Sequence, residues 1–302
     1  MLELHQGGLN VGVEGPLPER PLLAPWLRRL VREDELLLEY GDEIVVLEGE
    51  LAPVLSLDGA RELHRLAPGE RAAAAALAAE GVVVEGPVVA DEDALREAAA
   101  GRIPPSLAAR RLAAATLALV GAGAVAEEAA RLLPGKVRRQ AWDEEPVGDL
   151  AVAAPAPDEL PLLAGWNRRC LDASLPWLLV LPYNGRFASI GPLFVPGETC
   201  CYACFVARRA SALPDGTDLV ALQAEPAPYP GGRGLAAALG GLAATVAAGW
   251  IARADATTVG AFAALELEDG VRATRHRVFR VPRCEECSPA AEAPALVPWA
   301  SR

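Results

Sequence analysis

The stretch Thr116-Leu-Ala-Leu-Val-Gly-Ala-Gly-Ala-Val-Ala126 joins an uncharged run to two closely spaced glycines. An apolar run followed by such a turn predicts a buried β-strand over Thr116–Val120 and a helix over Glu127–Leu133. Gly121, Gly123 and Ala126 also match the alanine-ended form of the dinucleotide-binding pattern, in which a helix N-terminus faces a phosphate. Any tight strand-to-helix turn favours glycine as well, so the pattern predicts the fold more firmly than the ligand.

Strands and helices continue to alternate after this turn. Asp143 ends the next expected strand, where the ribose-binding acid of a nucleotide site belongs, and a helix is expected over Asp158–Ala173. This alternation predicts an α/β fold with a parallel sheet that is doubly wound, with helices on both faces. The expected strands are Val137–Trp142, Leu150–Ala154, Trp177–Leu181 and Phe187–Ile190, followed by a terminal hairpin of Phe262–Leu267 and Arg272–Val281.

The first 86 residues have a different pattern and predict a domain of their own. Two apolar-rich runs, Glu35–Glu39 and Glu43–Glu48, flank Tyr40-Gly41-Asp42 and predict a hairpin. Short helical patterns, an alanine-rich helix and a closing strand follow, the arrangement of a winged helix-turn-helix. These segments are Ala52–Ser56, Gly59–Leu66, Glu70–Glu80 and Val82–Glu85. We therefore expect a winged-helix domain over residues 1–86, a connector over 87–112 with a helix from Ser106, and the α/β domain over 113–302.

Two Cys-x-x-Cys pairs carry the strongest chemical signal in the chain. Cys201 with Cys204, and Cys284 with Cys287, can supply four thiolates in the closed tetrahedral shell of structural zinc sites. The alternatives are buried free thiols or two disulfides, and nothing marks the chain as secreted. Cys200 is expected to be a buried neighbour of the first pair. Cys170 is expected to be packed on a helix rather than reactive.

Charge and composition exclude several kinds of partner. The formal net charge is −12, so we expect no nucleic-acid partner. The residues around Glu3, His5 and Glu14 lack the pattern of a signal peptide, which favours a cytoplasmic protein. The uncharged stretch Gly234–Ala252 is rich in alanine and glycine and is expected to be a buried helix rather than a membrane span. A homodimer stays open.

Two further segments are assigned from composition. Thr217–Gly232 holds several prolines and glycines and is expected to be a mobile crossover loop, and Trp299 is a candidate partner anchor in the C-terminal tail. Trp177 is expected in the core. No serine, histidine or cysteine arrangement predicts a catalytic set.

The glycine turn, the alternating pattern and the two cysteine pairs together resemble the ThiF/MoeB family of adenylating proteins over residues 113 to 288. By that resemblance Asp158 corresponds to the magnesium-site aspartate and Asn167 to its downstream asparagine. A helix N-cap and a surface amide explain these two residues equally well. Only Glu144–Asp149 separate Asp143 from the next strand, which removes the segment that carries the family's triphosphate-binding arginine and lysine. Arg168 and Arg169 match no phosphate-binding position.

A more specific resemblance covers Gly191-Pro-Leu-Phe-Val-Pro-Gly-Glu-Thr-Cys-Cys-Tyr-Ala-Cys204. This segment is similar to the ThiF-like partner proteins of azole-forming, thiopeptide-type peptide pathways, which pair a leader-recognition domain with a ThiF-like domain that has lost ATP binding. The resemblance implies a degenerate nucleotide site at Gly121, Gly123, Asp143 and Asp158, with ATP not expected as a cofactor. It also implies structural zinc.

The function that this resemblance implies is binding. The protein would hold the leader of a ribosomal precursor peptide and present the core to a YcaO-type cyclodehydratase, which forms thiazolines or oxazolines. The leader would add as a strand at the edge of the winged-helix sheet. The expected groove lies between Ile44, Val45 and Val46 of the hairpin and Ala75, Leu77 and Ala78 of the alanine-rich helix, although such aliphatic residues in a small domain are also typical of a core.

Two enzyme classes remain as alternatives. Asp143 and Asp158 permit an ATP-dependent adenylating enzyme that activates a carboxylate, which pyrophosphate exchange would reveal. The glycine turn alone permits an NAD-linked dehydrogenase, but the sequence offers no catalytic acid for it.

Overall fold

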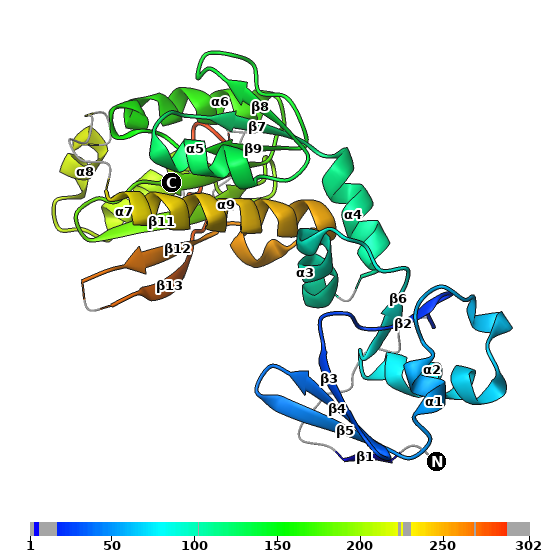
Figure 1. Ribbon diagram of the computed structural model, residues 1–302. Helices are drawn as coiled ribbons and strands as arrows, with labels where there is room; N and C mark the ends of the chain where they lie inside the picture. Colours follow the sequence, from blue (N-terminus) through cyan, green and yellow to red (C-terminus); the bar gives the residue numbers. More distant parts are fainter. Residues whose placement is uncertain are drawn as a thin grey trace, which may run out of the picture. The chain divides into compact units, whose positions relative to one another are not determined.

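The protein divides into two compact units, Met1–Leu112 and Ala113–Arg302 (Figure 1). The computed structural model describes residues 3–5, 17–101, 103–222, 225, 231–268 and 270–288. Trp299 lies outside these residues, as do 223–224 and 226–230 of the expected crossover loop. The first half of that expected loop contains a helix instead, α8 (Gly216–Leu222).

Unit 1 is built on an antiparallel sheet with the strand order β1-β5-β4-β3. The predicted hairpin is present, and Gly41 adopts the positive φ of +63° that its turn requires. Leu36, Leu38 and Leu47 alternate along the hairpin onto one buried face. The sequence prediction missed β3, whose five residues are all exposed. The strands are β1 (Glu3–His5), β3 (Arg28–Arg32), β4 (Glu35–Tyr40) and β5 (Glu43–Glu48).

Short helices and a second strand pair complete unit 1. The helix α2 begins at Pro68 because the Glu70 carboxylate accepts a hydrogen bond from the backbone N–H of Ala67 at 2.8 Å. The helix expected over Gly59–Leu66 is reduced to one 3-10 turn. The stretch expected as a connector holds two helices. The elements are β2 (Pro21–Leu23), α1 (Ala52–Leu55), η1 (Leu63–Arg65), α2 (Pro68–Ala79), β6 (Val83–Glu85), α3 (Glu92–Gly101) and α4 (Pro105–Ala114).

Unit 2 is a mixed α/β structure around a seven-stranded sheet of order β13-β12-β11-β10-β9-β7-β8. The first four of its strands along the chain are parallel, as predicted, but the other three are antiparallel. The predicted terminal hairpin, β12 with β13, is present. The parallel direction expected for β11 is wrong, because the segment 182–186 between β10 and β11 is too short for a crossover and closes a hairpin. The strands are β7 (Thr116–Val120), β8 (Lys136–Gln140), β9 (Leu150–Ala153), β10 (Trp177–Leu181), β11 (Phe187–Phe194), β12 (Ala261–Glu266) and β13 (Arg272–Arg277).

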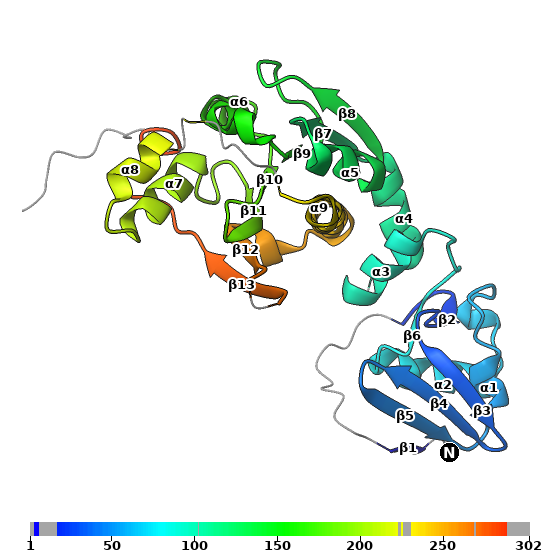
Figure 2. The same cartoon turned by 60° about the vertical axis from the view of Figure 1, so that its left-hand side comes forward.

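Helices pack on both faces of this sheet (Figure 2). One face carries α5 (Ala124–Leu132) and α9 (Arg233–Arg253), and the other carries α6 (Leu163–Asp172) and α7 (Tyr202–Ser211). The helix expected over Asp158–Ala173 is split into the 3-10 turn η2 (Pro157–Leu162) and α6, with Pro161 inside the turn. Trp177 is buried in the core, as expected.

The helix α9 is long and apolar enough to span a membrane, but half of its most apolar window is buried inside the protein. Its buried face packs in one cluster with α5 and the sheet. A Cβ at Gly240 would lie 2.6 Å from the Cβ of Glu128 and 2.8 Å from the backbone N of Ala129, both on α5. The absence of a side chain at Gly240 therefore sets the close approach of the two helices.

We expect Gly240→Ala and Gly241→Ala to change stability in opposite directions. The first should destabilise unit 2 by about 1–3 kcal/mol, because the new methyl overlaps α5. The second should stabilise it by up to about 1 kcal/mol through helix propensity, since the nearest atom to its Cβ, Cδ1 of Leu132, is 3.9 Å away. Denaturant unfolding of both variants tests this, and equal effects would contradict the close packing at Gly240.

Candidate metal centre and the glycine turn

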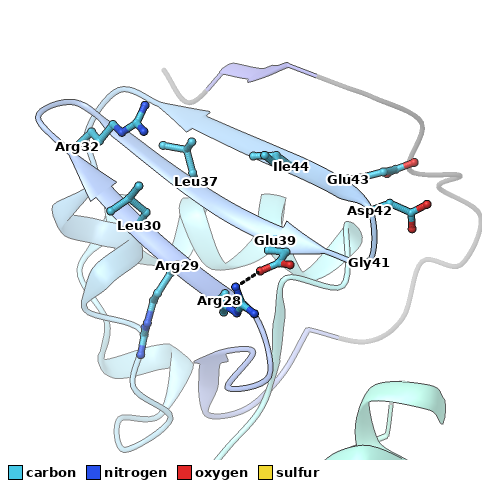
Figure 3. A pocket seen from close by; sticks show the side chains of 10 residues that line it. All are labelled: Arg28, Arg29, Leu30, Arg32, Leu37, Glu39, Gly41, Asp42, Glu43 and Ile44. Carbon is cyan, nitrogen blue, oxygen red and sulfur yellow. Dashed lines mark ion pairs between the residues drawn. The ribbon is translucent and has the colours of Figure 1, made fainter.

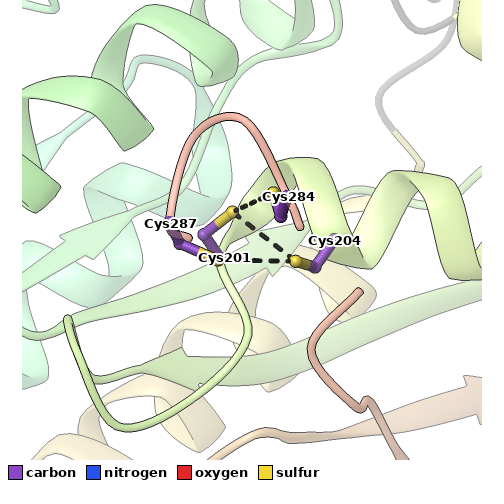
Figure 4. A group of neighbouring side chains, drawn as sticks. All are labelled: Cys201, Cys204, Cys284 and Cys287. Atoms are coloured by element: carbon purple, nitrogen blue, oxygen red, sulfur yellow. Dashed lines mark hydrogen bonds between the residues drawn. The ribbon is translucent and has the colours of Figure 1, made fainter. Parts of the chain in front are cut away.

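The four cysteines of the two Cys-x-x-Cys pairs lie together (Figure 4). The Sγ atoms of Cys201 and Cys284 are 3.7 Å apart, those of Cys204 and Cys287 are 3.6 Å apart, and all four lie within 4.8 Å of one another. A tetrahedral shell with zinc–sulfur bonds of about 2.3 Å places its sulfurs about 3.8 Å apart. The spacing therefore fits a single metal ion, and the prediction that these cysteines meet is confirmed.

Burial disfavours the thiolate form of Cys201 and Cys287 when no cation is present. Desolvation raises the pKa of Cys201 above its ordinary value and the pKa of Cys287 to about 11. At Cys284 desolvation is outweighed by hydrogen bonds from the backbone N–H groups of Cys287 and Glu286, so its pKa is lowered. Four sulfurs with no oxygen or nitrogen ligand are the donor set of structural zinc, and the arrangement can hold such an ion.

The surrounding structure holds the two cysteine segments in place. Asn167 on α6 is 1% exposed, and its Oδ1 accepts a hydrogen bond from the backbone N–H of Tyr202, the first residue of α7, at 3.0 Å. Arg168, next to it on α6, pairs with Glu286 at 2.9 Å. Both anchors run from α6 to the cysteine segments, so α6 positions the metal centre. Asn167 is thus buried and structural in its contacts, not a surface amide.

The other two cysteines behave as the sequence predicted. Cys200 is 3% exposed and does not belong to the group of four, and burial raises its pKa to about 12. Cys170 is fully buried in the core cluster that also contains Cys200, and burial raises the pKa of Cys170 as well.

The zinc prediction is tested by metal analysis. The purified protein should contain one zinc ion per chain, Cys284→Ser should lose it and Cys200→Ala should keep it. Because the raised pKa values leave Cys201 and Cys287 protonated at neutral pH without metal, zinc must displace protons and its affinity should fall as the pH falls. Retention of zinc by Cys284→Ser would contradict the site.

The glycine turn after β7 faces a cavity of about 360 Å³ at the ends of the parallel strands. Its lining comes mostly from small and apolar residues of the turn, of the segment after β9 and of the start of α9, and Arg233 is the charged residue among the described residues that line it. Gly121 has a φ of +114°, and a Cβ there would lie 2.1 Å from the carbonyl oxygen of Ala154. Strand packing alone therefore requires this glycine, whatever the cavity binds.

A carboxylate already occupies part of the turn. Oε2 of Glu159 accepts hydrogen bonds from the backbone N–H groups of Ala122 and Ala156, each at 2.8 Å. Oε1 of the same group accepts one from the indole Nε1 of Trp142, also at 2.8 Å. Glu159 therefore takes a donor of the glycine turn that a phosphate would use, and its charge would repel a phosphate placed there. Glu159 was not predicted from the sequence, although Ala156-Pro157 followed by an acid at the third helical position is a capping signal.

The two aspartates of the expected nucleotide site are not brought to this cavity. Asp143 and Asp158 are both exposed, and neither lines it. Gly123 does line it and has a φ of +84°. Of the four residues assigned to a degenerate nucleotide site, the glycines form the turn and the aspartates lie outside it. The residue that caps η2 is Glu159, not Asp158.

The neighbouring acids Glu159 and Asp158 make a matched test. We expect Glu159→Ala to lower the free energy of unfolding by about 1–3 kcal/mol, because three donors lose their acceptor. Asp158→Ala, at an exposed position, should change it by no more than about 0.5 kcal/mol. Thermal unfolding of the two variants measures the difference, and an equal response would rule out the role given to Glu159.

The residues assigned to a peptide groove divide between the core and the surface of unit 1. Val45 and Leu77 are buried in one cluster, whereas Ala75 and Ala78 are half-buried. Ile44 is 62% exposed on the outer face of the sheet. Figure 3 shows Ile44 there beside Leu37 and Leu30, with Arg28 paired to Glu39 at 3.2 Å. These residues border a shallow hollow of about 500 Å³.

Comparison with known proteins gives a fold and no family. No protein-family model matches the sequence, and no curated protein gives a significant match. Among solved structures, the heterocyclase TruD matches with 23% identity and a TM-score of 0.68 over 89% of this chain and 43% of its own. A heterocyclase in complex with substrate and cofactor matches with 21% identity and a TM-score of 0.67 over 88% and 39%. MccB of E. coli with MccA-N7isoASN matches with 13% identity and a TM-score of 0.60 over 88% and 99%.

At these identities the matches establish a shared fold. The chain spans less than half the length of the heterocyclase chains and nearly the whole of MccB. MccB is also known as a microcin C7 biosynthetic enzyme. The fold is thus shared with heterocyclases and with a microcin C7 biosynthetic enzyme, and the activity of this chain is a separate matter.

Proposed function

We propose that this protein binds the leader of a ribosomally made precursor peptide and presents its core to a separate YcaO-type cyclodehydratase that forms thiazolines or oxazolines. Unit 1 would be the winged-helix leader-recognition element. Unit 2 would be a ThiF-like platform held by structural zinc. The protein would act in the cytoplasm as a non-catalytic subunit.

The observation that carries this proposal is the fold match to two heterocyclase chains, which extends over 89% and 88% of this chain. The matched part amounts to 43% and 39% of those chains, so the likeness supports a role in heterocycle formation without assigning the catalytic step to this chain.

The glycine turn supports a non-catalytic role. Adenylation requires cations that stabilise the charge developing on phosphate. Here the carboxylate of Glu159 takes the Ala122 N–H, and Arg233 is the charged residue lining the cavity. The exposed aspartates Asp143 and Asp158 do not line it. These features favour a site that does not hold ATP.

One observation favours the alternative, an ATP-dependent adenylating enzyme that activates a carboxylate. MccB, which has been solved in complex with ATP, aligns with this chain over 99% of its own length at a TM-score of 0.55. An ATP-dependent exchange of pyrophosphate by the purified protein would establish this alternative and displace the proposal.

Calorimetric titration separates the two functions. The protein should bind a synthetic leader peptide from a precursor encoded beside it at micromolar concentrations, and it should show no heat with ATP and magnesium. Ile44→Glu, at an exposed site on β5, should weaken leader binding about tenfold or more, since a charge enters an apolar contact. Val271→Glu, at a position 84% exposed in unit 2, is the matched control and should bind normally. ATP binding without leader binding would overturn the proposal.

A further inference from the structure

The outer edge of β5 is only partly covered. On one side, β5 pairs with β4 over its whole length, from Glu43 to Glu48. On the other side β1 pairs antiparallel with its last three residues, so that Leu4 lies opposite Leu47. Among the residues that the structure describes, no strand is paired with Glu43, Ile44 or Val45 on that side. A short strand of the same chain therefore occupies half of the edge.

We propose that this edge is a strand-acceptor site, that β1 holds it in the free protein, and that an extended peptide displaces β1 on binding. The displacement deepens the proposed function and rests on it, with the leader as the incoming peptide. The acceptor site itself rests on the pairing of β1 with β5.

The length of β1 explains why it can be displaced. Its three residues pair with three of the six residues of β5. A longer segment can pair with all six and gain backbone hydrogen bonds that β1 does not make, which are the main source of affinity in strand addition. The covalent connection favours β1 through a high effective concentration, so an added peptide must compete with it.

The side chains of β5 define the peptide that fits. Residues directly opposite each other in an antiparallel pair lie on the same face of the sheet. Val45 and Leu47 are buried, at 6% and 0% exposure, on the face that packs against α2 and the core of unit 1. A segment with aliphatic residues two positions apart can continue this buried face. The occupant is therefore an extended peptide of alternating aliphatic pattern.

The opposite edge of the sheet is a poorer acceptor. It is formed by β3, which is exposed along its whole length and carries Arg28, Arg29 and Arg32. Charged residues on an edge strand are a common means of preventing the addition of another strand. The difference between the two edges favours β5 over β3 as the acceptor of an added strand.

Competition with β1 has a measurable consequence. The apparent affinity for an added peptide equals its intrinsic affinity multiplied by the fraction of molecules in which the edge is open. Removal of β1 should therefore tighten peptide binding without changing the site.

The experiment compares the intact protein with a variant lacking residues 1–16 and with the full-length variant Leu4→Pro, in which proline cannot join the strand ladder. A fluorescent peptide of residues 1–8 is titrated into each and followed by anisotropy. Both variants should bind it at least about tenfold more tightly than the intact protein, and a peptide carrying the same Leu→Pro change should not bind. Equal binding by all three proteins, or none, overturns the acceptor site.

The synthetic leader, titrated into the same three proteins, separates this inference from the proposed function. Tighter leader binding by both variants supports both. Leader binding that is equal in all three leaves the proposed function standing and overturns the displacement. Binding of the 1–8 peptide without any leader binding keeps the acceptor site and removes the proposed function. A dimer of the intact protein that truncation abolishes, seen by light scattering, would show β1 exchanged between copies and overturn its role within one chain.

Discussion

Four sulfur atoms join two segments that lie far apart in the sequence, the turn before α7 and the turn after β13. Cys201, Cys204 and Cys284 are buried in the same cluster as Trp166 and Phe205, so the centre is part of the core rather than an attachment to it. Without a metal ion this cluster would bury four closely spaced sulfur atoms that have no common ion to bind. The contacts that α6 makes through Asn167 and Arg168 do more than pack neighbouring elements together. They hold both cysteine segments at the distance that one ion requires.

The glycine turn shows that the fold alone can account for a nucleotide-binding pattern. Gly121 is required by the carbonyl of Ala154, and Gly123 by its backbone angle, so both residues are explained by the fold. The carboxylate of Glu159 meets donors from three separate segments, at Ala122, Trp142 and Ala156. The same charge that stabilises the turn would oppose a phosphate placed there.

Local signals in the sequence predicted most of what the structure shows in unit 2. The metal-ligand pattern of the cysteines could be predicted because each pair is contained in four residues. The strands around the glycine turn could be predicted because they are continuous apolar runs. The terminal hairpin was predicted as well, but the antiparallel direction of β11 was not, since it depends on how the chain returns after β10. Glu159 was overlooked because two of its three partners are distant in sequence. In unit 1, β3 was not predicted, because a strand with no buried residue shows no alternation of apolar and polar residues.

The central claim is that this protein supplies recognition while a partner supplies ATP-dependent chemistry. Reconstitution tests it most directly, with the precursor peptide, the YcaO-type enzyme and ATP combined with or without this protein, and with the product followed by mass spectrometry. The account predicts loss of water from the precursor only when both proteins are present, with no consumption of ATP by this protein and precursor alone. Formation of AMP and pyrophosphate by this protein and the precursor, in the absence of the partner, would contradict it.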